Sequence, residues 1–233
     1  MDRVSKTIGL ILWCAGLAVA TYFMFRLSVP YVSFEKNVDF LATKQNVYHI
    51  DYWRVAFYAH VFTSIMVLPA GFTQFNKTFF AQGWHRWLGM IYIITVLLIA
   101  APTGLLMGLH ANGGLGAKAS FVLLSLTWFV TTLLALVSAK QKRFAEHGEW
   151  LFYSYALTLS AITFRLLALG FDVFDIRVRP QEVYVTIAWL SWVPNLFVAH
   201  LLIKLGCVKR LLKNRGLAAN RHAPNQQKKS EPV

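Results

Sequence analysis

Acidic residues are scarce in this chain, which has 10 Asp and Glu among 233 residues, against 23 Lys and Arg. Charged residues of both signs make up 14% of the sequence, whereas a soluble domain normally has about 25%. No carboxylate lies in the middle of any long apolar run. A proton relay built on buried Asp or Glu side chains therefore has no obvious parts in this sequence.

Cysteine is also rare, with Cys14 inside the first apolar run and Cys207 at the end of the last. Neither position suits an extracellular disulfide, and no Cys-x-x-Cys-His motif for covalent haem attachment occurs. The chain also lacks a phosphate-binding Gly-Lys-Ser/Thr loop, a His-Glu-x-x-His motif and a Gly-x-Ser-x-Gly motif. These absences count against a nucleotide-driven pump and against a membrane hydrolase.

Long apolar runs dominate what is present, since hydrophobic residues make up 57% of the chain and the mean hydropathy is +0.49. Each run approaches the ~20 residues that an α-helix needs to cross a hydrocarbon core about 30 Å thick. Backbone at that depth must satisfy its own hydrogen bonds, so we predict an all-α polytopic membrane protein. A bundle of six transmembrane helices would occupy residues 1–206, and residues 207–233 would form a basic, disordered cytoplasmic tail. The predicted spans are Ile8–Leu27, Val55–Phe75, Trp87–Leu109, Ala119–Ala139, Trp150–Phe171 and Tyr184–Gly206.

Basic residues are unevenly distributed over the predicted loops. If both termini face the cytoplasm, most Lys and Arg, including those of 140–143 and 204–229, lie on the cytoplasmic side. The positive-inside rule favours this orientation, and the net charge of +13 then indicates anionic membrane lipid as the partner and no nucleic acid. Ala18-Val19-Ala20 resembles a signal-peptide cleavage site, but the apolar run continues through Phe25, so we expect the first helix to be retained.

Histidines near the predicted membrane boundaries are the main functional signal. His85, His147 and His200 fall on the cytoplasmic side, and His60 and His110 on the outer side. Two histidines that face each other across a bundle at one depth can ligate haem iron. We therefore consider the pairs His85 with His147 and His60 with His110, each of which would hold a haem b. Such a protein would move electrons between a quinone or soluble donor and an acceptor.

Arg165 lies about fifteen residues into the fifth run, where a guanidinium is expensive without a partner. A haem propionate, a bound anion, a lipid phosphate or a carboxylate of Asp172 or Asp175 would serve. The second interpretation needs no cofactor. Interfacial histidines are often ordinary polar helix ends, and His60 and His200 would then bond to neighbouring helices. The protein would be a small-molecule carrier or a membrane assembly subunit that binds an anion or lipid.

Two resemblances bear on these alternatives. The segments 83–89 (GWHRWLG), 147–151 (HGEWL) and 154–158 (SYALT), with Arg165, resemble a bacterial membrane-protein family catalogued as domain of unknown function 2306. That resemblance implies the bacterial cytoplasmic (inner) membrane but no chemistry, and Tyr153 stands where the family pattern has a basic residue. The histidine layout is similar to that of the di-haem cytochrome b family of transmembrane ascorbate and ferric reductases, which implies paired haem ligands.

The orientation can be tested with reporter fusions. Fusions after Lys142 and after Lys213 are expected to behave as cytoplasmic, and a fusion after Lys44 as external, because the basic residues divide in that sense. Activity of a cytoplasmic reporter and of a periplasmic reporter should be measured at each site. An external signal at Lys213 would contradict the predicted topology.

Overall fold

The computed structural model describes residues 3–75, 83–175 and 178–214. Within these segments the secondary structure is helical, and they contain no strand. Six helices are long and apolar enough to cross a membrane, which confirms the predicted all-α bundle. The α-helices are α1 (Arg3–Ser28), α2 (Asp51–Thr73), α4 (Trp84–Ile94), α5 (Ala101–Leu109), α6 (Gly114–Lys140), α7 (Phe144–Thr158), α8 (Ser160–Val173), α9 (Pro180–Leu190), α10 (Val193–Lys204) and α11 (Cys207–Asn214). Two 3₁₀ helices, η1 (Val29–Ser33) and η2 (Asp39–Lys44), and a π-helical segment, η3 (Thr95–Ala100), complete the described elements.

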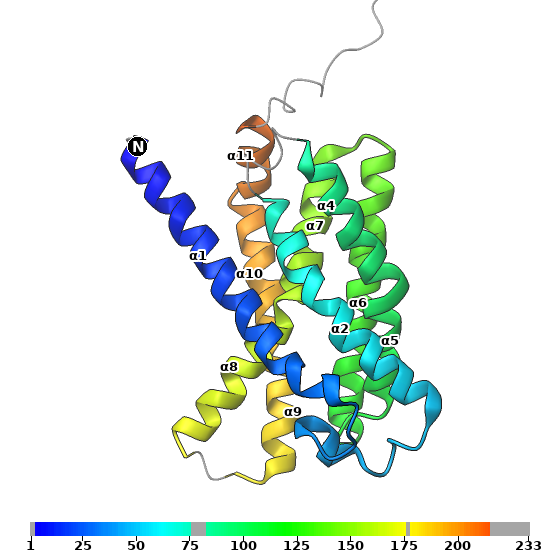
Figure 1. The fold of residues 1–233 in the computed structure, drawn as a ribbon. Helices are drawn as coiled ribbons and strands as arrows, with labels where there is room; N and C mark the ends of the chain where they lie inside the picture. Colours follow the sequence, from blue (N-terminus) through cyan, green and yellow to red (C-terminus); the bar gives the residue numbers. More distant parts are fainter. Residues whose placement is uncertain (1–2, 76–82, 176–177, 215–233) are drawn as a thin grey trace, which may run out of the picture.

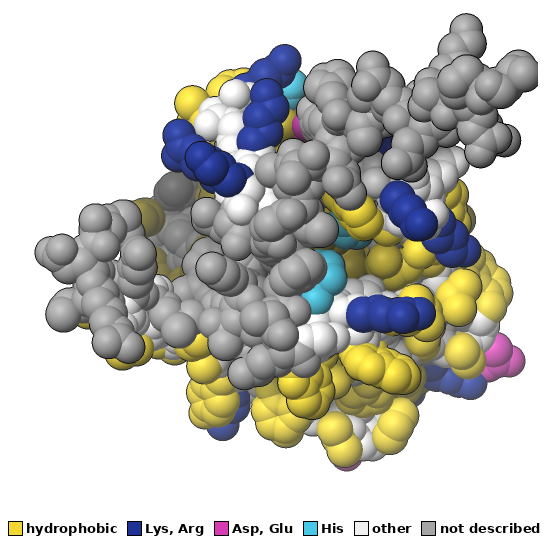
Figure 2. All heavy atoms as spheres, turned by 90° about the horizontal axis from the view of Figure 1, so that it is seen from above, with side chains coloured by type: hydrophobic (Ala, Val, Ile, Leu, Met, Phe, Trp, Pro, Cys, Tyr) yellow, Lys and Arg dark blue, Asp and Glu magenta, His cyan; other side chains and the backbone are white. Residues whose placement is uncertain are grey.

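The start of α1 and the helix α11 lie at the same end of the bundle, which we call the terminal side (Figure 1). The opposite end, the loop side, carries residues 29–50 and 110–113. Figure 2 looks onto the terminal side and shows several Lys and Arg side chains there. Which side faces the cytoplasm, and in which membrane, stays a prediction.

The predicted tail begins with ordered structure. Its first residues form α11, in which Val208 is buried and lies against Gly148 of α7. A Cβ on Gly148 would lie 2.7 Å from Val208 Cγ1, so the close contact requires glycine there. Residues 215–233 lie outside the described part of the chain.

Three of the six spans are interrupted. Pro102 has no N–H to donate to the carbonyl four residues before it, and the helix widens into η3 just ahead of α5. Pro194 likewise has no N–H to donate to the carbonyl four residues before it, and the helix is broken there between α9 and α10. The break at Leu159 has no proline. There Asn195 Nδ2 of α10 donates to the carbonyl of Ala156 at 3.3 Å, and a side chain that bonds to a helix carbonyl in this way kinks the helix.

This last break redirects the chain. Figure 1 shows α8 leaning away from the bundle, whereas α7 runs along it. Helix α6 packs closely on both α5 and α7, and α1 packs mainly on α2.

A cluster of hydroxyl groups is buried between α4 and α7, where Tyr92 Oη lies 2.6 Å from Ser154 Oγ and 2.9 Å from Thr158 Oγ1. Each hydroxyl thus has a partner in a region that offers little water.

Gly71 of α2 is expected to be intolerant of a side chain. A Cβ there would lie 2.6 Å from Tyr155 Cδ2 and 2.7 Å from Tyr92 Cε2, both of them ring atoms in the packed core. Gly71→Ala should therefore reduce the free energy of unfolding by about 1–3 kcal/mol, measured as a lower thermal midpoint in detergent. The matched control is Gly16→Ala in α1, where a Cβ meets nothing within 4 Å. Equal midpoints for both variants would contradict this packing.

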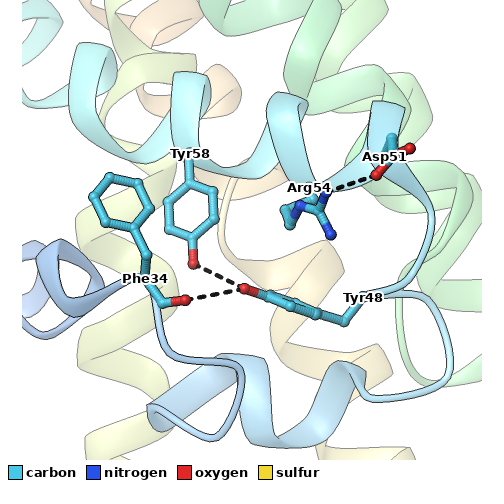
Figure 3. A network of polar contacts seen from close by, with 5 residues as sticks. All are labelled: Phe34, Tyr48, Asp51, Arg54 and Tyr58. Carbon is cyan, nitrogen blue, oxygen red and sulfur yellow. Dashed lines mark hydrogen bonds and ion pairs between the residues drawn. The ribbon is translucent and has the colours of Figure 1, made fainter.

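Residues 29–50 fold over the loop side of the bundle, and we call them the cap. Tyr31 and Leu41 of the cap are buried in one cluster with Trp53 and Phe57 of α2. A second attachment uses Tyr48, whose Oη donates to the Phe34 carbonyl at 3.2 Å and lies 3.3 Å from Tyr58 Oη (Figure 3). The cap is thus a packed layer that covers the helix ends beneath it.

Candidate functional site

A cavity of about 510 Å³ lies within the bundle beneath the cap. Ligand pockets for small molecules are typically ~300–1,000 Å³, so this one has room for a single ligand of that class. Its walls come from the cap and from all six spans. The helices that contribute most are α2, α6 and α8, and the break at Leu159 places α8 so that it forms one wall.

His60 of α2 lies in this cavity with one ring nitrogen engaged. Its Nδ1 lies 2.9 Å from the carbonyl of Ala100 and 3.2 Å from Thr103 Oγ1, so Nδ1 carries the proton of the neutral ring and donates to that carbonyl. Gly104 makes room for the ring, because a Cβ there would lie 3.3 Å from His60 Cε1. The other nitrogen, Nε2, then has a lone pair that can accept a hydrogen bond or bind a metal.

Arg165 of α8 lines the same cavity. Its Nη1 donates to the carbonyl of Ala161 in its own helix at 2.9 Å, and it has no ion pair within the described residues. It lies within electrostatic range of His60 and of Tyr31. Along their helices, His60 and Arg165 are roughly 13 Å and roughly 12 Å from the loop-side ends, and both line the cavity.

Lys44 of the cap is a further cation of this site, although the charge pattern of the sequence indicated only that it lies in an external loop. Its side chain is 2% exposed, and Nζ donates to the His110 carbonyl at 2.5 Å and to Asn112 Oδ1 at 2.7 Å. Burial, and secondarily the nearby charge of Lys118, lowers the pKa of Lys44 to about 8. Its position within the aromatic-rich stretch from Tyr31 to Trp53 was the available signal that this loop packs on the bundle.

The charged side chains of the cavity wall lie toward the cap. Lys44 and Asp39 line it at the cap, His60 and Arg165 lie deeper, and the deepest part is mostly apolar, with hydroxyl groups such as that of Thr158 among the apolar side chains. These apolar residues include Val67, Leu68, Leu124, Trp128 and Leu157. Two residues of the wall also carry buried polar atoms without a partner among the described residues: Trp53 Nε1 and Ser64 Oγ.

The other histidines singled out from the sequence lie elsewhere. His110 follows α5, where Nδ1 lies 3.2 Å from the Leu106 carbonyl and Nε2 lies 3.2 Å from Tyr52 Oη. His200 bonds through Nδ1 to Tyr153 Oη at 2.8 Å, and His147 Nδ1 lies 2.8 Å from the Ala135 carbonyl. His85 is in the first turn of α4 on the terminal side. Among the histidines of the described segments, only His60 lines the cavity.

These positions bear on the two haem pairs. The structure does not bring His60 and His110 together around the cavity, because both ring nitrogens of His110 are engaged outside it. The helices that carry His85 and His147 pack mainly on other partners, α4 on α2 and α7 on α6. Residues 3–75, 83–175 and 178–214 contain no cluster of three or more His, Cys, Asp or Glu side chains that could hold a metal ion. The ligand pairs stay predictions.

The chemistry that these residues offer is recognition of an anion. Arg165 and Lys44 are cations, Asp39 is the carboxylate of the cavity wall, and the neutral His60 ring adds an acceptor. A guanidinium in a partly dehydrated site binds carboxylate or phosphate oxygens at two points. The apolar depth of the cavity is suited to a hydrocarbon group.

Comparison with known proteins places the chain in a family. The family model DUF2306, described as a predicted membrane protein, matches residues 57–203, a range that runs from α2 to α10 and contains His60 and Arg165. It leaves out α1, the cap and therefore Lys44. No curated protein and no solved structure matches the chain. Because the family model covers more than half of the sequence, this integral membrane protein belongs to the DUF2306 family of predicted membrane proteins.

Proposed function

We propose that this protein is a membrane-embedded binding or carrier protein for an organic anion with an apolar body. The observation that carries the proposal is Arg165, a cation without an ion-pair partner in the described residues, in a cavity whose deeper wall is apolar. A charged side chain within a span is costly, so such residues usually face the interior and mark a substrate or ion site. An anionic ligand would supply the missing partner.

The neighbouring groups suit the same ligand. His60 presents Nε2 as an acceptor, which can receive a hydrogen bond from a protonated acid or from a hydroxyl on the ligand. Lys44 lines the cavity at the cap; two of its three N–H donors bond to His110 and Asn112, and its charge adds to the positive potential of the site. Together these groups can bind an acidic head group, while Val67 and Leu68 contact the hydrocarbon part.

Octanoate and octanol provide a matched pair of probes, with the same chain and with or without the charge. A ligand that binds the folded state stabilises it by RT ln(1 + [L]/Kd). We expect octanoate to raise the thermal midpoint of the full-length protein in detergent, and octanol at equal concentration to raise it much less. Equal shifts for the acid and the alcohol would overturn the proposal, because the cations would then have no part in binding.

Haem b is a second candidate, and one observation favours it. An axial histidine usually donates its other ring nitrogen to a carbonyl, as His60 Nδ1 does to Ala100. His60 would be the iron ligand and Arg165 the partner of a propionate. Bound haem would supply one-electron redox chemistry, with a quinone or a soluble donor as the electron source.

An absorption spectrum distinguishes the two candidate functions. Haem predicts a reduced-minus-oxidised difference spectrum of a b-type haem from protein expressed with ample haem supply, before and after dithionite. That spectrum should be lost in His60→Ala and kept in His110→Ala, because His60 lines the cavity and His110 does not. A colourless wild-type protein would exclude haem and would leave the anion-binding proposal untouched.

A further inference from the structure

We infer that the ligand is a single-chain acidic lipid, and that it enters the cavity sideways from the loop-side leaflet, between α1 and α8. The inference rests on the proposed function, because it assumes that the cavity binds an anion. It adds the source of the ligand, its class and its route. Three features of the cavity carry it: the position of its charged side chains, its side wall between α1 and α8, and the contacts that hold the cap on the bundle.

The polarity of the cavity runs in the direction of a lipid in the loop-side leaflet. The charged side chains lie between the cap and the level of His60 and Arg165, and below them the wall is mostly apolar, with Val67 and Leu157 beside uncharged hydroxyl groups. A lipid in that leaflet has its head group toward the loop side and its chain toward the membrane centre. It can therefore move sideways into the cavity without turning over. The volume of about 510 Å³ is that of a site for one small ligand, which favours one acyl chain over two.

The proposed entrance is the side wall between α1 and α8, two helices that scarcely pack on each other. Leu27 of α1 and Ile162 and Arg165 of α8 line the cavity and are partly exposed, as are several wall residues of α2. Deeper in the wall, Val67 of α2 and Leu157 of α7 are almost fully buried, at 0% and 1% exposed. Figure 1 shows α8 diverging from the bundle, and α1 packs mainly on α2. The lipid-facing flank of α8 is apolar, with Leu166 58% and Leu169 53% exposed.

The cap makes entry from water unfavourable. Trp53 and Leu41 are completely buried beneath and within it, and Lys44 ties it to the turn that carries His110 and Asn112. Asn112 Nδ2 also donates to Thr43 Oγ1 at 3.1 Å. A ligand that came through the cap would have to break these contacts. A ligand that comes from the bilayer would not.

The test uses the full-length protein reconstituted in phosphatidylcholine vesicles. Oleate, 1-oleoyl-lysophosphatidic acid or the neutral 1-oleoylglycerol is incorporated in the bilayer, and protein-bound lipid is followed over time by native mass spectrometry. We expect both acids to load and the neutral lipid not to load. In detergent, affinity should rise about fourfold for each methylene added from octanoate to dodecanoate, because each one is buried in the apolar depth.

Two variants locate the entrance. Leu27→Trp on α1 and Ile162→Trp on α8 should each slow loading at least tenfold, because both side chains stand at the proposed opening. The control is Tyr22→Trp on the exposed face of α1, which should load like wild type; Tyr22 is 64% exposed and does not line the cavity. Unchanged thermal midpoints would show that the variants fold.

Each remaining outcome overturns a separate statement. If octanoate stabilises the protein but neither acidic lipid loads from vesicles, the lipid inference is wrong and the proposed function stands. If both tryptophan variants load at the wild-type rate, the entrance is not between α1 and α8. If neither octanoate nor the lipids bind, the proposed function itself fails.

Discussion

Replacing Arg165 by glutamine or leucine is expected to weaken octanoate binding at least tenfold. Arg165 lines the cavity without an ion-pair partner in the described segments, so the ligand acid would be its counter-charge. Hydrogen bonds to charged groups contribute about 1.5–3 kcal/mol, which corresponds to roughly 10-fold to 150-fold in affinity. Arg165→Lys should fall between wild type and Arg165→Gln, because lysine keeps the charge but loses the planar pair of donors. Binding is measured from the ligand-dependent thermal midpoint in detergent.

The same variants should separate function from stability. Without ligand, Arg165→Leu is expected to be at least as stable as wild type, because it removes a dehydrated charge that no carboxylate compensates. The control is Arg179→Gln, in which an exposed arginine with a 3.7 Å surface ion pair to Glu182 is neutralised. That variant should bind like wild type. If the Arg165 variants matched wild type in both affinity and stability, Arg165 would be a lipid-facing residue and would not belong to the site.

Lys44 is expected to make the protein more stable as the pH rises from about 8 toward 10.5. In the folded state its pKa is lowered from 10.5 to about 8, first by burial and then by Lys118. Between these values the unfolded state binds more protons than the folded state, so the free energy of unfolding increases with pH. The free energy of unfolding would increase by up to about 3 kcal/mol in total. Below pH 8 Lys44 is protonated in both states and contributes no pH dependence, and the increase is complete only above the pKa of the unfolded state.

This pH dependence is measured as the difference in thermal midpoint between wild type and Lys44→Met from pH 7.5 to 10. The difference cancels other groups that titrate in this range. Lys44→Met also leaves the His110 carbonyl and Asn112 without their donor, so it should be less stable than wild type at pH 10. Lys36→Met, at an exposed lysine of the same loop, is the control and should follow wild type at every pH. A wild-type protein whose stability falls over this range in parallel with Lys44→Met would contradict the buried position of Lys44.

The sequence by itself determined the membrane class, the six spans and the depth of the key side chains. Span length and backbone hydrogen bonding leave little freedom in lipid, so the apolar runs were sufficient to predict six helices. The cost of an ionisable group inside a span likewise singled out His60, His200 and Arg165, of which His60 and Arg165 line the cavity and His200 bonds to Tyr153 outside it. The family could also be predicted from the sequence, since the segments that resemble DUF2306 lie within the matched residues 57–203.

Only the tertiary structure decided which of these residues meet. The histidine pairs came from depth alone, which says nothing about the direction in which a helix points a side chain. The break at Leu159 depends on Asn195 of another span, and it places α8, and with it Arg165, in the wall of a cavity shared with His60. The burial of Lys44 could not be predicted from the sequence either. It depends on the turn that carries His110 and Asn112, which lies more than sixty residues further along the chain. Contacts between distant segments depend on how whole helices pack, and hydropathy along the chain does not encode that packing.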